Sequence, residues 1–176
     1  MSDDPVHVAL LRGVNVGARR KLPMADLRAI LTALGCEAVR THIQSGNAVF
    51  RAPPGDWGVR IAQAIGARFP FTPQVMVVTR PAFDAIVSAN PFADKDPGRV
   101  QIGVLGAPSA TNPAALSALA APDESLALTE AAFYLHAPSG IGRSVLASRA
   151  ERLLDVPMTM RNARVAAAIT ALAHEV

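Results

Sequence analysis

A short polar segment near the N-terminus, Arg12-Gly13-Val14-Asn15-Val16-Gly17-Ala18-Arg19-Arg20-Lys21, gathers four basic side chains and two glycines. We expect it to lie between a strand and the start of a helix. Backbone N–H groups at a helix start attract anions, glycines let the backbone approach a ligand, and arginine and lysine add positive charge. The candidate anion contacts in this segment are Arg12, Asn15, Gly17 and Lys21.

This segment does not match the established phosphate-binding motifs. A P-loop has four residues between its glycines and then Lys-Ser/Thr, whereas three residues separate Gly13 from Gly17 and Ala18 follows. The dinucleotide fingerprint G-x-G-x-x-G is also absent from it. The alternative to anion binding is a solvated loop that uses its glycines only to turn.

A second polar candidate is Gln44-Ser45-Gly46-Asn47, between two strand-like runs. A nucleophile elbow, G-x-S-x-G, would need glycine at positions 43 and 47, which hold Ile43 and Asn47. We therefore interpret the string as a tight turn, because Gly46 and Asn47 are residues that tolerate positive φ. Its side chains, Gln44, Ser45 and Asn47, are candidate ligand contacts because they carry amide and hydroxyl groups.

A third candidate joins two strings in the second half of the chain, Ser139 to Ser144 and Met160 to Asn162. Each precedes an expected helix, so each offers flexible glycine or a capping side chain followed by N–H groups and arginine. Arg143, Arg161 and Asn162 are the candidate contacts, with a helix cap as the favoured interpretation of Asn162. We hypothesise that the three helix starts converge.

Metal and acid–base chemistry find little support in the sequence. The four histidines are scattered without the spacing of a zinc site, and the single cysteine, Cys36, is interpreted as a small buried hydrophobe. Asp94 and Asp96 lie in a Pro- and Gly-rich stretch and are interpreted as turn formers rather than paired catalytic carboxylates. We predict no metal and no cofactor.

The elements that must position these residues follow from the apolar pattern, which predicts the order βαββαβ for the first half. A short, nearly continuous apolar run that ends at Gly13 indicates a buried strand, and apolar residues at helical spacing after Pro23 indicate a helix. The Gln44 to Asn47 turn indicates an antiparallel hairpin. The expected strands are 6–12, 39–43, 48–51 and 74–79, and the expected helices are 23–34, 57–69 and 81–88.

The second half repeats the order βαββα. The expected strands are 100–105, 126–129 and 132–136, and the expected helices are 112–119, 144–154 and a last one whose core face carries Val165, Ile169, Leu172 and Val176. The predicted fold is α+β, with two ferredoxin-like halves of the βαββαβ type packed together and antiparallel sheets covered by helices. The expected division is 1–90, a linker at 91–98, and 99–176 with an extra C-terminal helix.

The amino-acid composition limits the classes of function that the chain can have. The chain has 176 residues, is 51% hydrophobic and 18% charged, and carries a formal net charge of +3, which is typical of a globular protein and does not require nucleic acid as a partner. Its apolar runs fall short of the roughly 20 residues that span a bilayer. The acidic start Met-Ser-Asp-Asp-Pro lacks the features of a signal peptide. We expect a cytoplasmic protein without a membrane partner.

Four strings taken together resemble the bacterial family catalogued as domain of unknown function 1697. They are Leu10 to Gly17, Lys21 to Met24, Ile43 to Asn47, and Gly142-Arg143-Ser144 followed by Arg161-Asn162. The resemblance spans nearly the whole chain. It implies a small intracellular bacterial α+β protein with ferredoxin-like halves, and it implies no agreed activity and no catalytic residues.

The chain departs from that family at three positions. Members of the family often have an aromatic residue where His42 stands, a lysine close to Val145 and a tryptophan where Ala163 stands. If those side chains contact a ligand, this chain has lost a stacking surface and a charge.

Three functions are compatible with the sequence. The leading hypothesis is binding of an anionic ligand, either a phosphate-bearing small molecule or nucleic acid, through Arg12, Asn15, Lys21, Gln44, Asn47 and Arg143. The first alternative is an enzyme acting on a phosphorylated or acyl small molecule with Ser45 or Asn15 near the chemistry, for which His42 is only a distant base. The second alternative is a homodimer formed by pairing of exposed sheet edges.

Overall fold

The computed structural model describes residues 3–17 and 19–176. The chain divides into two compact units, one formed by residues up to Asp84 together with Ala168–Val176, and the other by Ala85–Ala167. Each unit contains one four-stranded antiparallel sheet. The expected α+β fold with two halves is confirmed.

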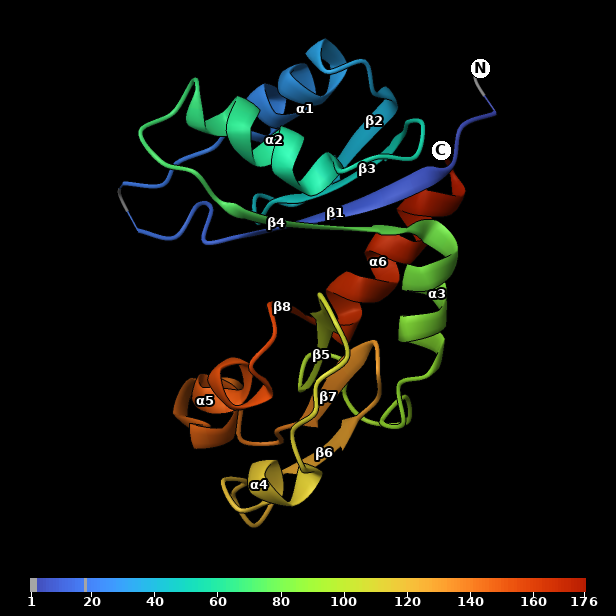
Figure 1. Ribbon diagram of the computed structural model, residues 1–176. Coiled ribbons are helices and arrows are strands. Elements are labelled where there is room, and N and C mark those ends of the chain that lie inside the picture. Colours follow the sequence, from blue (N-terminus) through green and yellow to red (C-terminus); the bar gives the residue numbers. More distant parts are fainter. Residues whose placement is uncertain (1–2, 18) are drawn as a thin grey trace. The chain divides into compact units, whose positions relative to one another are not determined.

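The first unit has the predicted order βαββαβ. Its sheet has the strand order β2-β3-β1-β4, and all neighbouring strands are antiparallel. Figure 1 shows α1 and α2 on one face of this sheet. The elements are β1 (Val6–Arg12), α1 (Met24–Ala33), β2 (Glu37–His42), β3 (Asn47–Arg51), α2 (Trp57–Gly66) and β4 (Gln74–Thr79).

The core of the first unit forms between the sheet and these two helices. Leu27 and Ile30 of α1 and Ile61 of α2 pack with strand residues such as Leu11 and Phe50, and all five are at most 1% exposed. Burial of these apolar side chains supplies the main driving force for forming the unit. Residues 6–11 of β1 are all buried, which confirms the expected buried strand.

The second unit repeats the same topology, with the strand order β6-β7-β5-β8. Leu116 of α4, Leu146 of α5 and Phe133 of β7 belong to its core. The unit therefore has the full order βαββαβ and not only the predicted βαββα. Its elements are β5 (Val100–Leu105), α4 (Pro113–Ser117), β6 (Ser125–Leu128), β7 (Ala132–His136), the short 3-10 helix η1 (Ile141–Arg143), α5 (Val145–Leu154) and β8 (Met158–Asn162).

The unit boundaries fall inside two helices, α3 (Arg80–Ser88) and α6 (Ala163–His174). The expected division placed the boundary at 91–98 and kept 168–176 in the second half. The two units differ from this expected division because residues 168–176 group with the first unit. Arg40 of β2 forms an ion pair with Glu175 at 2.7 Å, and His174 lies 2.9 Å from Asp84 of α3.

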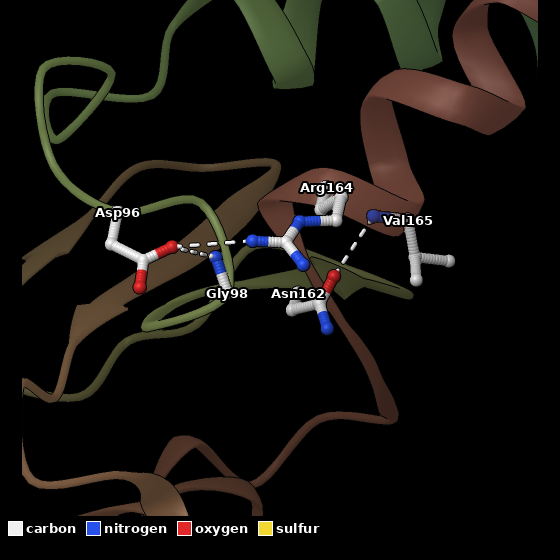
Figure 2. Close-up of polar contacts among 5 residues, drawn as sticks. All are labelled: Asp96, Gly98, Asn162, Arg164 and Val165. Carbon is white, nitrogen blue, oxygen red and sulfur yellow. Dashed lines mark hydrogen bonds and ion pairs between the residues drawn. The ribbon is translucent and has the colours of Figure 1, made fainter.

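The expected linker is a series of turns within the second unit. The Asp96 carboxylate accepts hydrogen bonds from the backbone N–H of Gly98 at 2.9 Å and from the Arg164 guanidinium at 3.5 Å (Figure 2). The backbone N–H of Arg164 also donates to the Pro97 carbonyl at 3.3 Å. These bonds join the segment to the first turn of α6, and Asp96 is a turn former as predicted.

Across residues 3–17 and 19–176, the structure contains no helix that is both long and apolar enough to cross a membrane.

Candidate functional site

The first two candidate segments lie side by side in the first unit because of the sheet register. Leu10 of β1 pairs with Asn47 of β3, so the end of β1 meets the turn between β2 and β3. The backbone N–H of Leu11 donates to the Gly46 carbonyl at 2.8 Å. Strand pairing therefore brings the loop that follows Arg12 to the turn that contains Gln44.

Gly46 makes the close approach of these two segments sterically feasible. It is buried and has a φ of +75°. A Cβ atom at this position would lie 2.5 Å from Cγ2 of Val14 and 2.7 Å from Cβ of Leu11, which is closer than carbon atoms pack. Both the backbone conformation and the available space thus require glycine here.

The side chain of Asn15 fastens the β1–α1 loop to the turn. Its Nδ2 donates to the Leu22 carbonyl at 2.9 Å and to the Gln44 carbonyl at 2.6 Å, while its Oδ1 accepts from the Leu22 N–H at 2.9 Å. An asparagine amide has two N–H donors, and both are used. The sequence led us to expect Asn15 as a ligand contact, whereas the structure assigns its amide to positioning the loop.

Asn15 also adopts the left-handed conformation that reverses the loop. Its φ is +56°, and its backbone N–H donates to the Arg20 carbonyl at 2.7 Å. Asparagine tolerates this conformation better than most residues. The loop between β1 and α1 is therefore a closed turn stabilised by its own hydrogen bonds, although Ala18 within it lies outside the described residues.

An open depression with a volume of about 350 Å³ lies between the loop and the turn, lined by Asn15, Gly17, Lys21, Pro23 and Gln44. None of these five residues is acidic. Gly17, Lys21 and Gln44 are exposed, so a ligand can reach them. The volume lies at the low end of the range for small-molecule sites. Pro23 was expected only as a helix residue and is an addition to the predicted set.

Further arginines add positive charge to the same loop. Arg12 is exposed at the end of β1, and its Nη1 lies 3.4 Å from Oε1 of Gln74, its register partner on β4. Arg19 and Arg20 are exposed, and the Arg20 guanidinium lies next to Gly13, where a Cβ atom would be 2.9 Å from Nη1. The loop thus combines positive charge with glycines.

Asn47 and Ser45 hold the turn together. The Asn47 side chain is buried at 1% exposure, and its Nδ2 donates to the His42 carbonyl at 3.1 Å and to Ser45 Oγ at 2.8 Å. Asn47 pairs in β3, and the positive φ values of this turn occur at Ile43 and Gly46. Asn47 therefore positions the turn, and the amide beside Ser45 is neither an acid nor a base.

The third candidate belongs to the second unit and is described by itself. Arg143 is exposed at the end of η1, and the following Ser144 caps α5 by accepting from the Ala147 N–H at 2.9 Å. Asn162 caps α6, as its Oδ1 accepts from the Val165 N–H at 2.8 Å (Figure 2). The interpretation of Asn162 as a helix cap is confirmed.

Arg161 lies on a strand rather than in a loop before a helix. It is half-buried on β8, where it pairs with Ile102 of β5, and its Nη1 donates to the Met160 carbonyl at 2.9 Å. Burial lowers the pKa of the Arg161 guanidinium to about 10. The expected helix does follow Asn162 directly, and what the sequence did not predict is that residues 158–162 form the strand β8.

Among the residues that the structure describes, no three or more His, Cys, Asp or Glu side chains are grouped so that they could hold a metal ion.

Comparisons with known proteins bear on the family and the fold. A family model described as "Protein of unknown function (DUF1697)" matches residues 5–134. The solved structure of conserved bacterial protein SP0830 from Streptococcus pneumoniae is similar with a TM-score of 0.69 and 23% sequence identity, over 96% of this chain and 98% of that one. At this identity the similarity concerns the fold. No curated protein matches the chain.

Proposed function

This chain belongs to the DUF1697 family of proteins of unknown function, and we propose that its first unit binds a small phosphate-bearing ligand. The proposed site is the depression between the β1–α1 loop and the β2–β3 turn. One observation carries the proposal. The Asn15 amide joins the loop to the turn, and Lys21 and Gln44 from these two segments line the same depression.

The chemistry of the lining residues suits an anion. The Lys21 ammonium is a positive point charge, the Gln44 side-chain amide can donate hydrogen bonds, and Gly17 lets a ligand approach the backbone. No lining residue carries a negative charge that would oppose binding. Charge-assisted hydrogen bonds of this kind are about twice as strong as neutral ones.

The start of α1 supports the same proposal. Pro23 lines the depression and occupies the N-cap position, where it makes no side-chain hydrogen bond. By contrast, Asp56 caps α2 and Asn112 caps α4 through their side chains. A helix start without a capping side chain leaves the first backbone N–H groups for an anion. The N–H of Asp26 in the same turn already donates to the Pro23 carbonyl at 3.0 Å, and its carboxylate adds a negative charge to this turn.

The size of the depression favours a small ligand over a nucleic-acid strand. A single-strand binder combines an extended basic groove with aromatic side chains on which bases stack. The five lining residues include no aromatic side chain, and the depression measures about 350 Å³. We therefore place a phosphorylated small molecule ahead of nucleic acid as the ligand.

Two lysines allow a matched test. Calorimetric titration with inorganic phosphate compares the wild type with Lys21→Ala and with Lys95→Ala, whose lysine pairs with Asp94 in the second unit. We expect Lys21→Ala to weaken binding about tenfold, because it removes one charge-assisted hydrogen bond. Lys95→Ala should bind like the wild type. Equal affinity of Lys21→Ala and the wild type would contradict the proposal.

A second titration distinguishes binding of nucleic acid from binding of a small ligand. Titration with single-stranded oligonucleotides of increasing length should give no gain in affinity per protein if the site holds one phosphate group. Affinity that rises with length and falls steeply with added salt would instead show recognition of the phosphate backbone. That result would overturn the small-ligand proposal.

A further inference from the structure

Two exposed apolar side chains flank the residues that line the depression. Val16 is 61% exposed and lies between Asn15 and Gly17 in the loop. Ile43 is 51% exposed and precedes Gln44 in the turn. The hydrogen bond from Asn15 to the Gln44 carbonyl brings the two short segments together at 2.6 Å. One branched apolar residue is thus adjacent in sequence to each of the two residues that form this bond.

The backbone conformation at Ile43 is unfavourable for its side chain. Ile43 has a φ of +48°, in the left-handed region that branched residues rarely adopt. Glycine or asparagine would occupy the same turn position without this strain. Backbone strain persists where neighbouring contacts hold it in place, and such positions cluster at ligand sites. The turn therefore carries an exposed isoleucine where local conformation disfavours it.

Two asparagines hold Ile43 in this conformation. The carbonyl of the preceding residue, His42, accepts from the Asn47 side chain at 3.1 Å. The carbonyl of the following residue, Gln44, accepts from the Asn15 side chain at 2.6 Å. The His42–Ile43 and Gln44–Ser45 peptide groups are thus each bound by a side-chain amide, so the contacts that form the site also restrict the turn around Ile43.

We infer that Val16 and Ile43 contact the apolar part of the ligand, so that the site takes a phosphate monoester of a compact apolar alcohol. The inference rests on the proposed function and specifies its ligand class. The phosphate would lie toward Lys21, and the alkyl or aryl group would lie against the two branched side chains. A folded protein partner fits less well, because a stable interface buries about 800 Å² on each side, far more than two side chains provide.

The experiment compares two probes on the full chain by calorimetry, inorganic phosphate and phenyl phosphate. The variants are Val16→Ser, Ile43→Asn and the control Ala38→Asn. Ala38 is exposed on β2 and has a φ of +49°, so this control changes a residue of the same backbone conformation at the other end of the strand.

We expect the wild type to bind phenyl phosphate about tenfold more tightly than inorganic phosphate, because part of the ring leaves water. Val16→Ser and Ile43→Asn should each reduce this preference while leaving the affinity for inorganic phosphate unchanged, and Ala38→Asn should retain it. Thermal unfolding checks the fold, and both asparagine variants should melt at or above the wild-type temperature because their strain is relieved.

The outcomes separate the two proposals. Equal affinity of the wild type for both probes, or an undiminished preference in Val16→Ser and Ile43→Asn, overturns this inference and leaves phosphate binding standing. Absence of binding of either probe to the wild type overturns the proposed function and the inference together.

Discussion

The side-chain amide of Asn15 donates to the carbonyl oxygen of Gln44 at 2.6 Å and so links two segments that are 29 residues apart in the sequence. The same amide exchanges two hydrogen bonds of 2.9 Å with the backbone of Leu22. The Asn15 amide therefore pairs with the Leu22 backbone as one strand pairs with another in a sheet. Its second N–H donor binds the turn through the Gln44 carbonyl. The geometry of the candidate site thus depends on a side chain whose two N–H donors are both used within the protein.

Replacing Asn15 with aspartate tests this positioning role. Asn15→Asp keeps the acceptor for the Leu22 N–H but removes both donors and places a carboxylate against two carbonyl oxygens. We expect a loss of about 1–2 kcal/mol in the free energy of unfolding, together with weaker phosphate binding. Denaturant titration and calorimetry measure the two effects.

Asn112→Asp is the matched control for this substitution. Asn112 caps α4 only through its Oδ1, which accepts from the Ala114 N–H at 2.9 Å. A carboxylate preserves that bond and suits a helix start, so stability should be unchanged or slightly higher. If Asn15→Asp were as stable as this control, the fastening role of Asn15 would be refuted.

Gly46 offers a second test of the contact between loop and turn. Gly46→Ala introduces a Cβ atom into the space held by Val14 and Leu11 and forces alanine to a φ of +75°. We expect the free energy of unfolding to fall by about 2–4 kcal/mol. Gly142→Ala, where a Cβ atom meets nothing within 4 Å, should stay within about 0.5 kcal/mol of the wild type. Similar stability of the two variants would count against the close approach.

The buried thiol of Cys36 predicts a pH dependence of stability. Burial raises the pKa of Cys36 from 9.0 to about 11, and its side chain lies in the core of the first unit. A raised pKa means that the folded state holds its proton more tightly than the unfolded state. The contribution is therefore complete below pH 9.0 and is lost as the pH rises toward about 11.

Comparison with Cys36→Ala isolates this contribution. Burial also raises the pKa of Tyr134, so the wild-type curve alone mixes two groups. We expect the stability difference between wild type and Cys36→Ala to shrink as the pH rises through this range, measured by denaturant titration at each pH. A difference that is independent of pH would show that the thiol titrates alike in both states.

Much of the fold was predictable because its signals are local. A continuous apolar run gave β1, and apolar residues at helical spacing after Pro23 gave α1, whose buried residues include Leu27 and Leu31. The hairpin between β2 and β3 followed from its turn string. These features depend on hydrophobic periodicity and turn chemistry, which the sequence displays directly.

Strand β8 was missed because its sequence carries a weak strand signal. Met158-Thr159-Met160-Arg161-Asn162 contains one branched residue, and only its first two residues are fully buried. The strand lies at the sheet edge and pairs with β5 alone. Its extended conformation is therefore set by pairing with a strand distant in sequence, which local pattern does not reveal.

The sequence allowed us to predict which segments form the candidate site, but not what each side chain does within it. Polar residue types pointed to Asn15 and Asn47 as ligand contacts, whereas their amides bind backbone carbonyls. Ile43 was taken as a strand residue, although it is exposed at positive φ. Roles of this kind depend on which backbone groups come within hydrogen-bonding distance after folding, and a single sequence does not display those distances.

The most direct test of phosphate binding in the first unit is an amide NMR titration of the ¹⁵N-labelled chain with inorganic phosphate. Binding at the depression predicts saturable shifts of the backbone amides of Gly17, Lys21 and Gln44, all of which line it. The same titration of Lys21→Ala should need more phosphate to reach half-saturation. Shifts confined to the second unit, for example around Arg143, or an absence of saturable shifts at Gly17, Lys21 and Gln44 would contradict the proposed site.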